Sequence, residues 1–180
     1  MEAAVARISL VSLLQRAYSG ELAAAYAYTG HGNSVRDAKE KVEIDRIRVE
    51  EVQHRKRVGE ILAELGAGPS KAREIIFTIV GRTISALCRI GGWFIPMYGA
   101  GKLERGNIVE YEHAALLAQY AGFDHLIDDL LTMAEVEWDH ELYFRTKASS
   151  SFLWKVCPNW SVPPPRESIR ASFYQERARA

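Results

Sequence analysis

Residues 44–65 read IDRIRVEEVQHRKRVGEILAEL and indicate the class of fold. Apolar residues recur every three or four positions along this stretch, which places them on one face of an amphipathic helix. Glu51 and His54 occupy positions on that same face. The stretch stops at Gly66-Ala67-Gly68-Pro69, a sequence that ends helices. A helix is therefore predicted here, with one carboxylate and one imidazole turned toward the core.

Three further stretches have the same spacing, and each also carries glutamate on its apolar face. The polar members are Glu21 in the first stripe, Glu112 in the third, and Glu137 with His140 in the fourth. The four stripes are Leu10, Leu14, Ala17, Glu21, Ala24 and Tyr28; Ile44, Ile47, Glu51, His54, Val58, Ile61 and Leu65; Ile108, Val109, Glu112, Leu116, Gln119 and Tyr120; and Leu126, Leu130, Met133, Glu137, His140 and Phe144. Four amphipathic helices predict an all-α four-helix bundle.

The helix ends support this assignment and place the polar residues at matched depths. Asn33, Ser34 and Asp37 are candidate caps between the first two helices, Gly122 is suited to end the third, and Asp124 is suited to cap the fourth. In an antiparallel pair, residues at equal depth lie at equal distances from the turn. The turn regions lie midway between Glu21 and Glu51, and between Glu112 and Glu137.

Between the second and third helices lies Ile75 to Tyr98, which is rich in apolar residues. A helix of about 20 residues spans roughly 30 Å, so this segment is predicted to be one long helical crossover between helices two and three. Arg82, Arg89 and the Gly91-Gly92 pair argue against a transmembrane span. The residues suited to contact lipid or a hydrophobic ligand are Ile75, Ile76, Phe77, Ile79, Val80, Trp93, Phe94 and Ile95, for which core packing is the alternative.

Length and composition favour one bundle domain, residues 1–148, followed by a partly proline-rich tail, residues 149–180. Lys plus Arg and Asp plus Glu both total 23, so the chain lacks the basic field that concentrates nucleic acid. Cys88 and Cys157 form no metal-binding or redox motif, which suits free thiols in the cytoplasm. The segment from Val5 to Leu14 lacks the features of a signal peptide.

Glutamates on core-facing positions need a partner, because burying an unpaired charge is costly. Glu51 with His54, and Glu137 with His140, are each one helical turn apart and can each offer an oxygen and a nitrogen to one metal ion. Two divalent cations would balance the charges of four carboxylates. The sequence therefore predicts a centre of two iron ions, with manganese as the alternative, whose ligands are Glu21, Glu51, His54, Glu112, Glu137 and His140.

Each of these residues also has a simpler interpretation. A lone Glu-x-x-His pair on a helix is usually a solvated pair, and only the two pairs together with the two further glutamates favour metal. Glu110 competes with Glu112, but the face of Glu112 is the more apolar. The remaining histidines fall off the stripes or near turns and are expected to be surface or locally bonded: His31, His113 and His125. Two tyrosines can either support the ligands or pack in the core: Tyr28 and Tyr120.

Over roughly residues 10 to 146 the chain resembles the ferritin-like di-iron carboxylate superfamily and is most similar to the demethoxyubiquinone hydroxylase family. The resemblance is carried by Gly20-Glu21 with Ala24, Tyr28-x-Gly30, Glu51-x-x-His54, Gly101-Lys102, Glu112 and Glu137-x-x-His140. It implies a ferritin-like bundle whose six predicted ligands bind two iron ions. It also implies an O2-dependent monooxygenase that acts on the ring of a quinone intermediate in ubiquinone biosynthesis.

This resemblance implies dioxygen, a hydrophobic quinone-like substrate and an external electron donor as partners. It also implies a cytoplasmic protein with peripheral contact to the inner face of the membrane, made by the crossover. One alternative is a rubrerythrin-like peroxidase or ferroxidase, and another is a non-enzymatic iron-binding protein of the ferritin type. Nucleic acid is not expected as a partner, and assembly into a homo-oligomer is left open.

Overall fold

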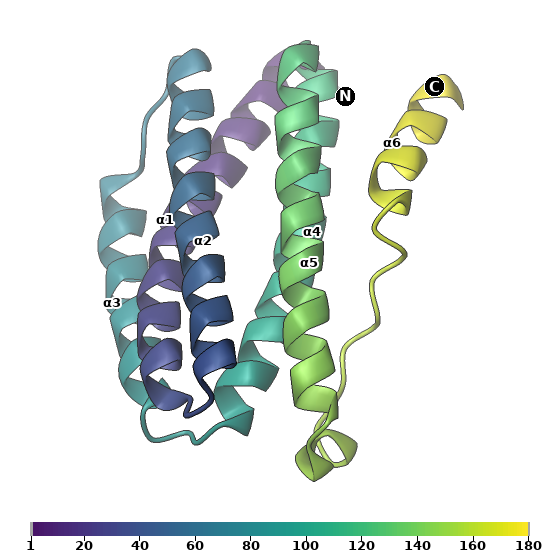
Figure 1. Ribbon diagram of the computed structural model, residues 1–180. Coiled ribbons are helices and arrows are strands. Elements are labelled where there is room, and N and C mark those ends of the chain that lie inside the picture. The colour runs from purple at the N-terminus through teal and green to yellow at the C-terminus, as the bar shows by residue number, and fades with distance from the viewer. Residues whose placement is uncertain (1, 180) are drawn as a thin grey trace. The chain divides into compact units, whose positions relative to one another are not determined.

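The computed structural model describes residues 2–179, and all regular secondary structure in that range is helical. The elements are α1 (Ala3–Ser34), α2 (Ala38–Glu64), α3 (Lys71–Cys88), α4 (Phe94–Tyr120), η1 (Asp124–Leu126), α5 (Ile127–Ser149), η2 (Phe152–Lys155) and α6 (Ser168–Arg179), as drawn in Figure 1. The predicted all-α class is confirmed. The chain divides into two compact units, Val11–Pro96, and Met1–Leu10 with Met97–Ala180.

In the unit Val11–Pro96, α1 and α2 form a helical hairpin with the predicted turn. The carboxylate of Asp37 caps α2 by accepting hydrogen bonds from the backbone N–H groups of Lys39 and Glu40, at 2.8 and 2.9 Å. The other end of α2 is followed by Gly66, whose φ of 66° is costly for any residue with a Cβ. Every residue of the stripe predicted for α2 is buried, including Glu51 and His54.

Helix α3 packs on α1 through small residues. A Cβ atom on Gly81 would lie 2.6 Å from the Cα atom of Ala23, and one on Gly30 would lie 2.2 Å from the carbonyl oxygen of Ser85. The two backbones therefore approach too closely for larger side chains at these positions. Several apolar residues of α3 remain exposed, with 63% of Ile75 and 62% of Ile79 accessible to solvent.

Polar contacts hold the first half of α3. The Arg55 guanidinium lies 3.7 Å from the centre of the Tyr18 ring and donates hydrogen bonds to the Tyr18 carbonyl and to the carboxylate of Glu74 on α3. Burial alone would raise the pKa of Glu74, but hydrogen bonds from Arg55 and Ser19 and the charge of Arg55 lower it below its usual value. Arg55 thus connects all three helices of this unit.

The crossover is shorter than predicted. Helix α3 ends at Cys88, and Gly92, with a φ of 67°, interrupts the helical path before α4 begins at Phe94. The predicted single helix from Ile75 to Tyr98 is therefore wrong at its C-terminal end. Phe94 is buried, and the indole N–H of Trp93 donates to the carboxylate of Glu40 at 2.8 Å, so neither belongs to the exposed face of α3.

In the second unit, α4 and α5 form the other hairpin, with a turn at Gly122, whose φ is 79°. The stripe predicted for α5 is buried throughout. The stripe predicted for α4 is wrong in phase: Ile108 is buried, but Val109 and Tyr120 are exposed. Small residues supply much of the buried face instead: Ala114, Ala115 and Ala118.

The C-terminal residues fold back along α5. Figure 1 shows this segment doubling back from the end of α5 to the yellow helix α6. The predicted cap Asp124 lies in the short helix η1, where its carboxylate accepts a hydrogen bond from Arg177 of α6 at 2.6 Å. The tail therefore belongs to the same compact unit as α4 and α5.

Among the residues that the structure describes, none of the helices has both the length and the apolar character needed to cross a membrane.

The contact between Gly81 and Ala23 gives a first prediction. Gly81→Ala should lower the free energy of unfolding by about 1–3 kcal/mol, because the added methyl group meets the α1 backbone. Gly106→Ala is the matched control in a helix, since a Cβ there meets nothing within 4 Å, and it should raise stability by about 0.5–1 kcal/mol. Urea unfolding followed by circular dichroism measures both, and equal stability of the two variants would contradict the close packing.

Candidate metal-binding sites

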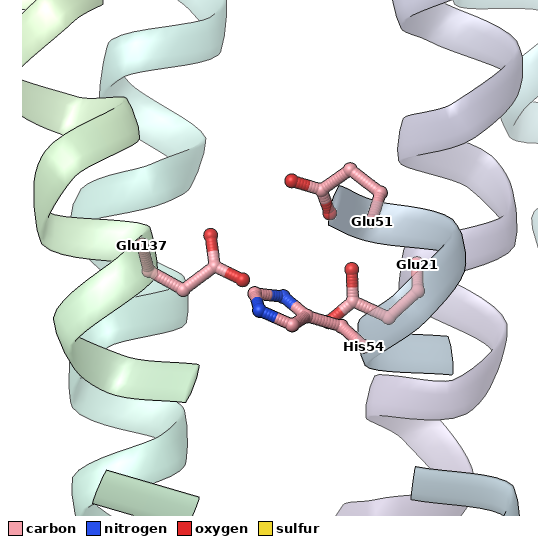
Figure 2. Close-up of side chains that lie close together, drawn as sticks. All are labelled: Glu21, Glu51, His54 and Glu137. Carbon is pink, nitrogen blue, oxygen red and sulfur yellow. The ribbon is translucent and has the colours of Figure 1, made fainter. Parts of the chain in front are cut away.

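The unit Val11–Pro96 contains a buried set of three possible metal ligands: Glu21 from α1, and Glu51 and His54 from α2. One donor atom from each lies within 4.8 Å of the donor atoms of the other two. Figure 2 shows the three side chains extending from α1 and α2 and lying close together. Their exposed fractions are 4%, 0% and 7%, so the donors are shielded from bulk water.

The second unit contains a set of the same composition: Glu104 from α4, and Glu137 and His140 from α5. One donor atom from each again lies within 4.8 Å of the other two. The Nδ1 atom of His140 is 3.5 Å from a carboxylate oxygen of Glu137, and the amide of Asn107 donates to Glu104 at 2.8 Å. Glu104 is 1% exposed, and Glu137 and His140 are fully buried.

Local helix geometry explains both sets. In each Glu-x-x-His pair the two residues are three apart, so they lie on the same helix face, one turn from each other. A single glutamate from the other helix of the hairpin completes each set. Carboxylate oxygens and imidazole nitrogens suit iron, manganese and zinc. The buried Glu and His groups can therefore hold metal ions, and their donor chemistry fits the predicted cofactor.

Five of the six predicted ligands lie in these two sets, and Glu112 does not. Glu112 is half-buried, two turns along α4 from Glu104. Tyr111 continues the buried face, and Glu112 is displaced from it by about 100° around the helix. Glu104, a member of the second set, was not predicted because the α4 stripe was placed in the wrong phase. One feature of the sequence could have identified Glu104: the turn residue Gly122 lies midway between Glu104 and His140, which places these two residues at equal depth in the hairpin.

The histidines and tyrosines that were not predicted as ligands differ in whether they are buried or exposed. His31 is buried and stacks on Tyr28, with ring centres 6.3 Å apart, and burial lowers its pKa to about 4. His31 is therefore a neutral, locally packed residue rather than a surface one. His113 and His125 are exposed, in agreement with the prediction, and Tyr120 is 43% exposed and so is not a core residue.

Comparison of the chain with protein-family models, curated proteins and solved structures finds no match.

The choice between Glu104 and Glu112 can be tested directly. Glu104→Gln should reduce the bound metal by roughly one ion per chain, because it removes one carboxylate charge from a three-ligand set. Glu112→Gln is the matched control on the same helix and should retain the wild-type metal content. Elemental analysis after desalting, with helicity checked by circular dichroism, measures both. Loss of metal from the Glu112 variant alone would restore the sequence-based assignment.

Proposed function

We propose that each ligand set holds one divalent metal ion, so that the chain binds two, with iron as the expected metal and manganese as the alternative. The observation that carries this proposal is that two separate hairpins bury the same donor set, two carboxylates and one imidazole. Buried acidic groups are costly to keep ionised without a cation. A purely structural role would not require the same two carboxylates and one imidazole in both units.

The proposal includes the arrangement that the sequence predicts. The four helices α1, α2, α4 and α5 would form a ferritin-like bundle with α3 as its crossover, and the two ions would act as a di-iron centre. Glu104 takes the place of Glu112 as the ligand from the third bundle helix. Mössbauer spectra of the iron-loaded protein would show magnetic coupling between the two ions if they form a pair.

The proposed reaction is O2-dependent oxidation, most specifically the hydroxylation of a quinone ring with electrons from an external donor. Bound iron would supply the redox chemistry with dioxygen. The side chains of this protein hold the metals and keep bulk water from the donors, since Glu51, Glu137 and His140 are fully buried. The backbone of each Glu-x-x-His helix fixes the relative orientation of its two donors.

The exposed apolar face of α3 favours the proposal that the substrate is hydrophobic. Ile75, Ile76, Ile79 and Val80 are between 42% and 63% exposed, and Leu87 extends the same helix with 53% exposure. Contiguous exposed apolar residues of this kind mark binding surfaces. We propose that this face contacts a quinone-like substrate and the surface of the membrane that contains it, with the protein on the cytoplasmic side.

The function is tested by loading the protein with iron under anaerobic conditions, reducing it, and adding dioxygen with and without a hydrophobic quinone lacking one ring substituent. Substrate that gains one oxygen atom, detected by mass spectrometry, supports the monooxygenase. The double variant Glu51→Ala/His54→Ala, which lacks two ligands, is the control and should yield no product.

The other outcomes of this experiment identify the alternatives. Unchanged quinone with rapid consumption of hydrogen peroxide would indicate a rubrerythrin-like peroxidase. Unchanged quinone with continued uptake of ferrous iron and dioxygen would indicate a ferroxidase or an iron-storing protein. Absence of both bound iron and bound manganese in wild-type protein would refute the proposal as a whole.

The α3 face gives a separate prediction. The double variant Ile76→Ser/Ile79→Ser should reduce binding to liposomes and raise the KM for a hydrophobic quinone at least several-fold, because it removes two exposed apolar contacts. Val42→Ser is the matched control, since Val42 is 71% exposed on α2, and it should behave as wild type. Co-sedimentation with liposomes and steady-state kinetics measure the effects. Identical behaviour of all three proteins would assign the α3 face no role in substrate binding.

A further inference from the structure

The C-terminal segment, residues 158–177, is attached to α4 and α5 along much of its length. The Tyr98 hydroxyl on α4 donates to the carbonyl of Pro158, and the Trp138 indole on α5 donates to the carbonyl of Pro164 at 2.7 Å. Further along, Arg170 pairs with Glu135 at 2.7 Å. These contacts fix the segment against the same two helices that carry Glu104, Glu137 and His140.

Trp160 is the residue of this segment that reaches between the helices. A Cβ atom on Gly101 of α4 would lie 2.8 Å from Cζ2 of Trp160 and 3.1 Å from Cβ of Phe144 on α5. The indole therefore occupies space that exists because residue 101 is glycine. Its ring also packs edge-on against Tyr98 and Trp154, with ring centres 5.4 and 5.0 Å apart.

The indole N–H of Trp160 donates a hydrogen bond to a carboxylate oxygen of Glu141 at 2.8 Å. Glu141 is fully buried, and its carboxylate also accepts hydrogen bonds from Arg145 at 2.9 and 3.2 Å. These donors stabilise the buried charge of Glu141. Glu141 is thus held by Trp160 and Arg145, and it belongs to neither ligand set.

The residues that Trp160 contacts lie close in the sequence to two of the ligands. Glu141 directly follows His140, and Gly101 lies one helical turn before Glu104. Trp160 therefore touches α4 through Gly101 and α5 through Glu141 within about one turn of the ligand set. The hydrogen bond joins Trp160 to α5, and the ring lies against α4 beside Gly101.

We propose that Trp160 is a positioning residue for the set formed by Glu104, Glu137 and His140. This inference rests on the proposed function only in that the set must bind a metal ion. Replacing a residue that hydrogen-bonds a metal ligand commonly lowers metal affinity 10- to 100-fold, and Trp160, which acts through the neighbouring Glu141, is expected at the lower end of that range. The C-terminal segment then has a defined role, which is to hold the α4 and α5 ligands in the geometry that the ion requires.

Cobalt(II) titration of the full-length apo protein tests this inference, because the visible spectrum of bound cobalt reports the ligand geometry. Trp160→Phe keeps a ring beside Gly101 but loses the hydrogen bond to Glu141, and Trp160→Ala loses both. We expect cobalt affinity to fall on the order of 10-fold in the first variant and further in the second, with altered spectra in both. The two variants should differ from wild type even when their helicity is unchanged.

Two controls separate positioning from general attachment of the segment. Arg170→Gln removes an ion pair between the segment and α5, and Trp154→Phe changes a neighbour of Trp160 within the aromatic cluster. Both should retain the wild-type cobalt affinity and spectrum. Wild-type values in folded Trp160→Phe would overturn the inference while leaving the proposed function intact. Failure of wild-type protein to bind cobalt or iron would overturn both.

Discussion

The cost of burying carboxylate charge is the constraint on which this structure depends. Glu21, Glu51, Glu104 and Glu137 lie on buried helix faces, in positions where an apolar residue would strengthen the core. An ionised carboxylate is tolerated there only beside a cation or strong hydrogen-bond donors. Glu141 on α5 is a buried carboxylate held by hydrogen-bond donors, since Arg145 and Trp160 both donate to it. The two ligand sets contain carboxylate and imidazole donors, which suit the binding of a metal cation.

The proposed metal sites require that the helices carrying the ligands keep fixed positions, which directional polar contacts favour. A bundle held only by apolar packing tolerates small shifts of one helix against another, because non-directional contacts are remade after a shift. A metal ion does not tolerate them, since its ligands must stay within a few tenths of an ångström of their required distances. The hydrogen bonds that the buried carboxylate of Glu141 on α5 accepts from Trp160 and Arg145 are directional and suit that requirement.

Much of the fold followed from the sequence where large apolar residues mark the buried face. The stripes of α2 and α5 were predicted correctly because Ile and Leu contrast sharply with the charged residues between them. In α4 the contrast is weak, since alanines form part of the buried face while Leu103 and Val109 are exposed. The phase was therefore wrong, and the buried position of Glu104 was not predicted. The position of Trp160 depends on contacts distant in the sequence, which periodicity does not reveal.

The packing of α3 on α1 has a consequence for how the protein responds to temperature and fluctuation. Because Gly81 and Ser85 face α1 while Ile75, Ile76 and Ile79 are exposed, docking this helix leaves much of its apolar surface in water. Close contact between small residues, as in helices packed within lipid, supplies the attraction instead. Detachment of α3 therefore carries only a small change in heat capacity, and its amide hydrogens are expected to exchange through local opening well below the free energy of global unfolding. The exposed apolar face of α3 is thus expected to lie on a helix that can adjust its position through local opening.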